Sequence, residues 1–565
     1  MIWTTLFWST LEENTRLAVY GVRRGGKAPW IIDVVGAMGD GVVHPASRPL
    51  SRATSAWWSY ERPATYEVVG ATVDVEVRDG VTIACELRRP ARDGVPVDGR
   101  FPSVVVEFTP YVVLRDFYLG EADFFAARGY NALVPSLRGV GRSGGRWDHG
   151  SFRQAGRDAH DVIEWLAAQP YSDGRVGMFG ESFGGQTSYS AAVERPAHLL
   201  AIAPMQSPSS LYHDVVFPGG IKATERGEID NWPDVANLTT DGVVDADAEF
   251  AANREHPTFD EFWRDRSFVE CLDVVTIPVL AIGGWNDGYF RSGTLANIEA
   301  LPARTWAIYG PWPHFFPVAL TDDPMFSTTD GDDLARVEAD APPMSPGVLL
   351  AWFDHWVARL PDVPIPMAPT FTSYEGPVGV GGGWRELDAW DPDGAVGTEW
   401  VLDGDGSLLA EPGDPGRVTF RQPGDPDGGV DSATFTSAPL TADQTLVGHP
   451  SLTFGATLDA PDAHFYVELF DVEADDNERW VNDGFLAASH RRSHVDPTPV
   501  PVGESVEYRV AIRAHHYRFR AGNRVRVRVS GGAPSKLTLP ATPVTVMMET
   551  GATALLRIPG FIADR

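Results

Sequence analysis

The sequence predicts a two-part protein, in which an α/β domain is followed by an all-β domain. Its 565 residues exceed the length of one ordinary domain and suggest roughly two to four. Between residues 71 and 375, short apolar runs alternate with helical segments, which is typical of a doubly wound α/β fold. From residue 376 to 565, apolar and polar residues alternate in short runs between turns, which predicts an antiparallel sandwich or jelly roll.

The α/β part begins with a hairpin. Residues 73–77 alternate apolar and charged side chains, as expected of a half-buried strand, and Asp79-Gly80 supplies the turn into a returning strand at 81–87. The β-branched run at 103–108 predicts a strand that is buried on both faces of a parallel sheet. We expect the next elements at 117–128 (helix), 131–135 (strand), 152–169 (helix), 176–180 (strand), 186–194 (helix) and 199–204 (strand).

A segment at 208–271 interrupts this alternation. It is rich in aromatic and acidic residues and has no strand pattern. An insertion at this point of an α/β sheet would lie over the carboxyl ends of the strands, where such sheets place their sites, so we expect a helical cap. The alternation then resumes with strands at 277–283 and 304–310 and ends with a helix at 346–360.

These patterns divide the chain into four parts. Residues 1–70 show little periodicity, and they are either an extension of unknown role that packs loosely or the product of an upstream start codon. The other parts are the α/β domain (71–207 and 272–375), the cap (208–271) and the C-terminal β domain (376–565).

Composition excludes several classes of function. The formal net charge of −31 argues against nucleic acids and anionic membrane surfaces as partners. No apolar run approaches the length of a membrane span, and the N-terminus lacks the basic region of a signal peptide, so we expect a cytoplasmic protein. Cys85 and Cys271 have neither metal nor redox spacing, which predicts buried thiols. The sequence has no metal or nucleotide motif, and we expect no cofactor.

The pattern Gly-x-Ser-x-Gly occurs twice, and its context separates the two copies. Gly180-Glu181-Ser182-Phe183-Gly184 follows an apolar strand and precedes a helical run, which places Ser182 on a sharp turn at a helix N-terminus. Glycines are needed there because a Cβ would collide with the opposing backbone. The copy around Ser143 lies in a glycine-rich loop with no helix start after it. We therefore predict Ser182 as a nucleophile, with N–H groups of the helix N-terminus available to a developing oxyanion.

A serine nucleophile needs a histidine base, which a carboxylate orients. In the α/β-hydrolase arrangement the order is Ser, Asp or Glu, His, each on a loop at the carboxyl end of a strand. Asp287 follows the strand that ends at 283, and His314 follows the strand that ends at 310. The correct order on consecutive strands predicts a Ser182–Asp287–His314 triad. His149, before the nucleophile, and His355, inside a helix, are weaker candidates.

Further segments share their pattern with a known family. They are Arg78-Asp79-Gly80-Val81, Thr109-Pro110-Tyr111, Arg138-Gly139-x-Gly141-x-Ser143, Asp173-Gly174-Arg175-Val176-Gly177-Met178, Gly284-Trp285-Asn286-Asp287-Gly288, Gly310-Pro311-Trp312-x-His314 and Gly484-Phe485-Leu486-Ala487-Ala488-Ser489-His490-Arg491. Through them the chain resembles the cocaine esterase and X-prolyl dipeptidyl-peptidase (CocE/NonD) family of serine hydrolases, from about residue 71 to the C-terminus.

The resemblance implies an α/β-hydrolase domain with a helical cap and a C-terminal jelly roll. It also implies that the Tyr111 hydroxyl and the Phe183 backbone N–H form the oxyanion hole. The chain departs from the family at Ser136, where aspartate is more frequent, and residues 1–70 have no counterpart. The bonding inside the loop after Ser136 is therefore expected to differ.

We expect a hydrolase of acyl esters, or of amides, whose substrate is a small-molecule ester, an amide or a short peptide. An X-Pro dipeptidyl-peptidase or an α-amino acid ester hydrolase is the alternative within this class, and a catalytically silent binding module is the alternative outside it. The sequence leaves the oligomeric state open, a homo-oligomer included.

Two sets of residues bear on the substrate. An apolar acyl group would suit the aromatic residues near the predicted catalytic loops, which are Trp285, Tyr289, Trp312 and Phe315. A dipeptidyl-peptidase must instead bind a free ammonium with carboxylates. The acidic residues available for that role are Glu181, Glu225, Glu228 and Asp230.

Overall fold

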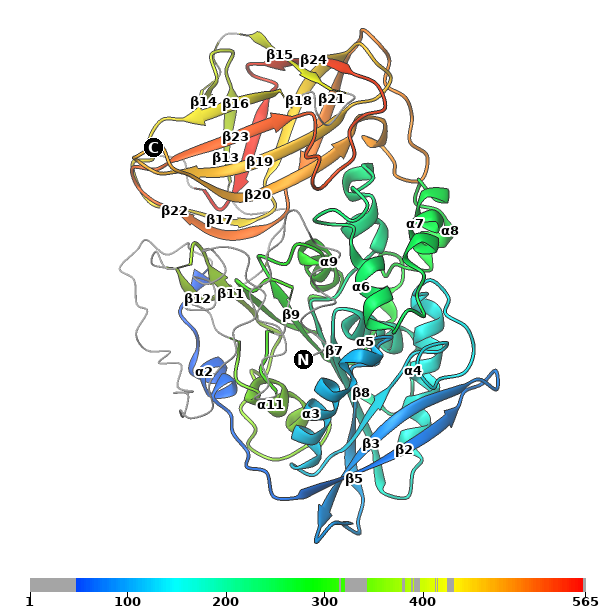
Figure 1. Cartoon of the computed structure of the whole chain (residues 1–565). Coiled ribbons are helices and arrows are strands. Elements are labelled where there is room, and N and C mark those ends of the chain that lie inside the picture. The colour runs from blue at the N-terminus through cyan, green and yellow to red at the C-terminus, as the bar shows by residue number, and fades with distance from the viewer. Residues whose placement is uncertain are drawn as a thin grey trace.

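The computed structural model describes residues 47–314, 317–320, 343–378, 382–387, 390, 397–411, 413, 415–423 and 431–561. Within this part of the chain, twelve strands form one sheet, eleven strands form a second and two strands form a third. The first sheet and its helices make up the lower half of Figure 1, and the second sheet makes up the upper half. The predicted succession of an α/β domain and an all-β domain is confirmed.

Seven parallel strands form the middle of the twelve-stranded sheet. In spatial order they are β6 (Asn131–Pro135), β5 (Phe101–Val106), β7 (Ser172–Glu181), β8 (Leu199–Met205), β9 (Val279–Gly284), β10 (Thr305–Gly310) and β11 (Phe371–Glu375). Antiparallel strands extend both edges. They are β3 (Thr82–Arg92), β2 (Glu67–Glu76) and β4 (Val95–Pro96) beside β6, and β12 (Gly383–Leu387) and β1 (Ser47–Arg48) beside β11.

Helices cover both faces of this sheet, each face with its own apolar core. One core includes residues of α4 (Phe152–Ala167), α5 (Phe183–Glu194) and α9 (Arg291–Ala300). The other includes residues of α2 (Arg52–Trp58), α3 (Arg115–Ala126) and α11 (Gly347–Trp356). A parallel sheet with helices on both faces places the carboxyl ends of its strands at one edge, where loops can carry a site.

The segment at 208–271 is helical, as its lack of strand pattern predicts. Its elements are η2 (Tyr212–Val216), η3 (Pro218–Gly220), α6 (Trp232–Thr239), α7 (Ala246–Glu255) and α8 (Glu261–Arg264). Further short turns of helix among the described residues are η1 (Val112–Leu114), η4 (Leu272–Val274) and η6 (Ala488–His490). In Figure 1 the helices α6, α7 and α8 lie at one side of the molecule, beside the α/β domain and below the β domain.

The C-terminal sheet is almost entirely antiparallel, with one parallel pair between β14 and β16 in the part described. Its strands are β13 (Gly397–Leu402), β14 (Ser407–Leu409), β15 (Gly416–Gln422), β16 (Ser432–Ser437), β18 (Ser451–Leu458), β19 (His464–Val472), β20 (Glu478–Ala487), β21 (Ser505–Ala511), β23 (Arg524–Ser530), β24 (Val544–Thr550) and β25 (Leu555–Pro559). The separate pair is β17 (Gln444–Gly448) and β22 (His515–Phe519). The jelly-roll connectivity stays a prediction.

The expected boundary at residue 70 is wrong for the described part of the N-terminal segment. Strand β1 pairs with β12 at the edge of the large sheet, and β2 begins at Glu67. The Trp57 side chain is buried, and its indole N–H donates to the backbone O of Val348 at 3.0 Å. Residues 47–70 therefore belong to the α/β domain. A two-residue strand and a seven-residue helix are too short to produce a periodic signal, which explains the error.

The domain change also comes later than residue 376, because β12 continues the large sheet through Leu387. Residues 1–46 lie outside the described part of the chain. Among the described residues, no helix combines the length and apolar character needed to cross a membrane.

Candidate active site

Ser182 lies at the turn between β7 and α5, at the carboxyl edge of the sheet. Its backbone has φ 57° and ψ −114°, a left-handed conformation that a non-glycine residue adopts only at a cost. The Ser182 N–H donates to the backbone O of Met205 on the neighbouring strand β8, at 2.9 Å. The strained turn is therefore fixed to the neighbouring strand of the sheet.

The two glycines of the motif are required by close contacts, one with backbone and one with the buried Glu107 side chain. A Cβ added at Gly180 would lie 2.6 Å from the Cα of Gly184. A Cβ added at Gly184 would lie 2.1 Å from Oε2 of Glu107. Neither position has room for a larger residue, in agreement with the steric reason given for the sequence pattern.

The structure brings Ser182, His314 and Asp287 into one hydrogen-bonded chain. The Nε2 atom of His314 lies 3.0 Å from Oγ of Ser182, and its Nδ1 atom lies 3.0 Å from Oδ2 of Asp287. The three residues follow β7, β10 and β9 respectively. An imidazole between a hydroxyl and a carboxylate is arranged to accept a proton from the hydroxyl and to stabilise the resulting charge.

Asp287 is held by the first residues of the turn into α9. Its Oδ1 atom accepts the backbone N–H groups of Tyr289, at 2.9 Å, and Phe290, at 3.0 Å. The aspartate is buried. Because the two N–H groups occupy Oδ1, the other carboxylate oxygen, Oδ2, bonds to the imidazole. The rings of Tyr289 and Phe290 contact the His314 ring edge to face, with centroids 5.0 and 5.1 Å away. These contacts fix the imidazole on the faces that its hydrogen bonds leave free.

Tyr111 and Phe183 also lie next to Ser182. The Tyr111 side chain is near enough to interact with Ser182, and burial raises the pKa of its hydroxyl above the usual range, so this hydroxyl stays protonated at neutral pH. Phe183 is the first residue of α5, whose N–H groups in the first turn have no acceptor within the helix. The two aromatic rings meet edge to face at 6.0 Å.

Two of the predicted pocket aromatics are core residues. Trp285 is 1% exposed, its ring packs 4.3 Å from that of Tyr309, and its indole N–H donates to the backbone O of Tyr374 at 3.1 Å. Trp312 is 3% exposed and packs against Trp384 at 5.5 Å. Side chains enclosed by protein in this way have no surface left for a substrate. Both residues are therefore removed from the set of substrate contacts.

The other two aromatic predictions have different outcomes. Tyr289 contacts the His314 ring, and its hydroxyl donates to Oδ1 of Asn231, in the segment at 208–271, at 2.5 Å. Tyr289 thus stays a candidate for the substrate pocket. Phe315 lies outside the described residues.

Of the four acidic residues considered for an ammonium, two are in ion pairs, one is exposed and one is buried. Glu225 pairs with Arg254 at 2.7 Å, and Asp230 pairs with Lys222 at 2.6 Å. Glu228 is exposed to solvent. The backbone N–H of Glu181 donates to Oε1 of Glu107 at 2.8 Å, and the Glu181 side chain is buried. In the described residues, these four carboxylates do not form a free acidic cluster beside Ser182.

The buried carboxyl group of Glu107 contacts the turn that carries Ser182, and the sequence analysis did not identify it. Glu107 directly follows β5 with φ 45°, accepts the Glu181 N–H, and contacts the glycine positions of the motif. Burial raises the pKa of Glu107 above its usual range, which favours the neutral acid. The sequence did contain a signal for this role of Glu107, because a charged residue directly after a strand of β-branched residues is unusual.

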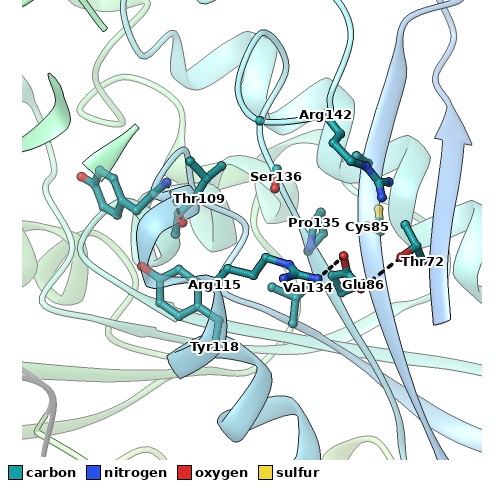
Figure 2. A pocket seen from close by; sticks show the side chains of 14 residues that line it. Thr72, Cys85, Glu86, Thr109, Arg115, Tyr118, Val134, Pro135, Ser136 and Arg142 are labelled. Carbon is teal, nitrogen blue, oxygen red and sulfur yellow. Dashed lines mark hydrogen bonds and ion pairs between the residues drawn. The ribbon is translucent and has the colours of Figure 1, made fainter. Parts of the chain in front are cut away.

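A cavity of about 350 Å³ has Tyr111 among its lining residues, and Figure 2 shows the side chains around this cavity. It is lined by the end of β6, by β3, and by the loop that carries Thr109 and Tyr111; Arg115 on its wall donates to Glu86 at 2.6 Å. Ser182 and His314 are not among its lining residues. Of the candidate site residues that the structure describes, Tyr111 alone lines this cavity.

Two family models match the chain. The model described as X-Pro dipeptidyl-peptidase (S15 family) matches residues 79–316, which include Ser182, Asp287 and His314. The model described as X-Pro dipeptidyl-peptidase C-terminal non-catalytic domain matches residues 354–554. The order of the two matches is the order of the two domains observed.

The chain is also similar to individual known proteins, in sequence and in fold. Cocaine esterase from Rhodococcus sp. (strain MB1 Bresler) is 28% identical over 539 residues, covering 82% of this chain and 90% of that protein. A CocE/NonD family hydrolase from Staphylococcus aureus shares the fold with a TM-score of 0.70 at 20% identity, over 87% of this chain and 94% of that one. An α-amino acid ester hydrolase shares it with a TM-score of 0.70 at 19% identity, over 95% and 100%.

Proposed function

Because the chain belongs to the CocE/NonD and X-Pro dipeptidyl-peptidase family of serine hydrolases, we propose that it cleaves acyl esters through an acyl-enzyme on Ser182. The main support is the hydrogen-bonded chain from Ser182 through His314 to Asp287, with both distances at 3.0 Å. Cocaine esterase, a relative that spans most of this chain, is named for an ester substrate. The family makes the chain a serine hydrolase. We propose in addition that Ser182, His314 and Asp287 are its catalytic residues and that its substrate is an ester.

In the proposed mechanism, Oγ of Ser182 attacks the acyl carbon while Nε2 of His314 takes its proton. The carbonyl oxygen becomes an oxyanion, which the Tyr111 hydroxyl and the Phe183 N–H stabilise. When the tetrahedral intermediate collapses, the imidazolium gives its proton to the departing alkoxide and the acyl group stays on Ser182. Water then attacks the acyl-enzyme, gives a proton to His314, and the carboxylic acid leaves as Ser182 regains its proton. Asp287 fixes the imidazole and stabilises its charged form.

The segment at 208–271 acts in this proposal as a cap beside the site. Two contacts support that role: Asn231 accepts the Tyr289 hydroxyl at 2.5 Å, and Glu249 on α7 accepts the Trp147 indole N–H at 2.7 Å. Trp147 in turn packs against Phe183 at 6.2 Å. The segment therefore connects to residues on both sides of Ser182. In the same proposal, the C-terminal strands form a jelly roll.

The role of Tyr111 can be tested by removing one oxygen. Tyr111→Phe keeps the ring that packs against Phe183 and deletes one donor, so kcat should fall by about 10²- to 10³-fold with little change in KM. Steady-state kinetics on a 4-nitrophenyl ester measures both parameters, and thermal unfolding shows whether the variant is folded. An unchanged kcat in a folded variant would reduce Tyr111 to a packing residue.

The engaged carboxylates favour an ester over an X-Pro peptide. A peptidase of that kind must hold a free ammonium, whereas Glu225 and Asp230 are paired with Arg254 and Lys222. Breaking a partly buried ion pair to bind the substrate would cost free energy that an uncharged acyl group does not require. We therefore expect kcat/KM to be higher for short acyl and aryl esters than for Ala-Pro anilides.

A substrate panel tests this preference. It should contain a 4-nitrophenyl ester, the anilide of the same acyl group and Ala-Pro 4-nitroanilide, because esters are intrinsically easier to cleave than amides. The matched anilide separates the effect of the leaving group from the effect of the ammonium. If Ala-Pro 4-nitroanilide had the higher kcat/KM by roughly tenfold or more, and Glu225→Gln or Glu228→Gln abolished that advantage, the chain would be an X-Pro dipeptidyl-peptidase. That reading is the second candidate because the S15 family model matches residues 79–316.

A further inference from the structure

The C-terminal domain reaches the loop of Asp287 through a buried ion cluster. Asp483 lies on β20 of that domain and is 0% exposed. Nε of Arg513 donates to its Oδ1 at 2.7 Å, and Nζ of Lys536 donates to its Oδ2 at 3.3 Å. The Tyr466 hydroxyl donates to Oδ2 at 3.2 Å. The carboxylate is thus held inside its own domain by two cations and a hydroxyl.

A third cation comes from the α/β domain. Arg291 is the first residue of α9, in the turn that follows Asp287, and it is 2% exposed. Its Nη2 lies 3.8 Å from Oδ1 of Asp483. Its Nη1 donates to the backbone O of Trp285 at 2.7 Å. Trp285 and Arg291 stand on either side of Asp287 in the chain, so this bond closes the Asp287 loop across its two ends.

A second contact between the domains meets the same loop. The His515 ring, from β22, stacks on the Trp285 ring at 5.1 Å and 25°. Tyr309 of β10 packs on Trp285 as well, and its hydroxyl donates to the backbone O of Arg291 at 2.6 Å. The start and the end of the Asp287 loop are therefore both fixed by buried partners. In Figure 1, α9 and β9 lie at the side of the α/β domain that faces β17 and β22.

From these contacts we propose that Asp483 is a positioning residue for Asp287, although it belongs to the domain that carries no reacting group. Asp483 holds the Arg291 guanidinium, Arg291 holds the Trp285 carbonyl, and the closed loop presents Asp287 to His314. The inference rests on the proposed function, because it assigns Asp483 a part in activating Ser182.

Electrostatics explains why the carboxylate is needed. Burial and, after it, the nearby Arg513 lower the pKa of Arg291, the charge of Asp483 raises it, and the combined result is about 9. Without the Asp483 charge, two buried guanidinium groups would repel each other with less compensation. Arg291 would then move away from Trp285, and the loop would open. A displacement of about 1 Å at a catalytic group can cost roughly 10²-fold in rate.

The test compares Asp483→Asn with a matched control in the full chain. The control is Asp471→Asn, because Asp471 is a buried carboxylate on β19 whose partners, Tyr517 and Asn523, both belong to the C-terminal domain. For each variant, the rate of labelling by a fluorophosphonate and the kcat and KM for 4-nitrophenyl butyrate are measured. We expect Asp483→Asn to lower the labelling rate and kcat by roughly 10- to 100-fold, with KM little changed. Asp471→Asn should keep the wild-type rates.

The outcomes separate this inference from the proposed function. A wild-type chain that is neither labelled nor active on any ester would overturn the proposed function. If the wild type is labelled and Asp483→Asn is labelled at the same rate, the positioning role alone is overturned. The same conclusion follows if Asp471→Asn loses as much labelling rate and kcat as Asp483→Asn.

A second variant decides the case in which Asp483→Asn does not fold, as judged by circular dichroism. Arg291→Met removes the other end of the contact and should slow labelling by the same roughly 10- to 100-fold. A wild-type rate in Arg291→Met contradicts the proposal. Where both variants fold, the double variant should be no slower than either single one, because both changes break the same connection. Additive losses would show that Asp483 does not act through Arg291.

Discussion

Ser182→Ala should reduce kcat for every hydrolysed ester by about 10⁶-fold. The reason is that, in the proposed mechanism, Oγ of Ser182 forms the acyl-enzyme, and this atom lies 3.0 Å from Nε2 of His314. His314→Ala should lose as much, since nucleophile and base act as one unit. Initial rates at high enzyme concentration would measure the residual activity.

The chain supplies its own control for this variant. Ser143 lies in the second Gly-x-Ser-x-Gly pattern, where its Oγ donates to the backbone O of Ser136 at 2.8 Å and accepts the Ala84 N–H at 2.9 Å. Ser143→Ala removes both of these structural hydrogen bonds and should cost about 1–3 kcal/mol of stability, with kcat preserved. If Ser182→Ala kept half of the wild-type rate while folded, Ser182 would not be the nucleophile.

Asp287→Asn is the second large effect, expected to lower kcat by about 10⁴-fold. The amide keeps the size of the side chain, and its carbonyl oxygen can still accept the N–H groups of Tyr289 and Phe290. Its NH2 group would then point at Nδ1 of His314 and favour the wrong tautomer. The loss should therefore appear in kcat with the fold intact.

Steady-state kinetics together with the unfolding temperature measures this prediction. A loss confined to KM would indicate that Asp287 shapes the substrate pocket rather than the imidazole. An inactive variant with a greatly lowered unfolding temperature would instead indicate a structural role, because the two N–H bonds to Oδ1 also hold the turn into α9.

The positions of Ser182, Asp287 and His314 could be predicted from the sequence because they depend on local signals. Each follows a strand with a clear apolar pattern, and parallel strands bring their carboxyl ends to one edge. The hydrogen-bonded chain among them is observed, while their catalytic roles await the experiments above. The succession of the two domains was also predictable from local signals. Apolar residues recur about every 3.6 residues in a helix and every 2 residues in a half-buried strand, and over long stretches these two patterns are easily distinguished.

Other features could not be predicted because they depend on partners distant in sequence. Trp285 stands in a glycine-rich loop, where an aromatic residue suggests exposure, yet Tyr309 and His515 bury it. Arg291 and Asp483 each have an ordinary sequence context, and only the packing of two domains brings them together. Burial of Trp57 against Val348 likewise depends on a contact that a single sequence does not encode locally.

The central claim is that Ser182 is the residue that becomes acylated. Mass spectrometry of the chain after reaction with a fluorophosphonate tests this claim most directly, because the adduct can be mapped to one residue. The account predicts one adduct per chain, on Ser182, that is absent from Ser182→Ala and forms much more slowly in His314→Ala. An adduct on Ser143 or another residue, or ester hydrolysis that continues without any adduct, would contradict it.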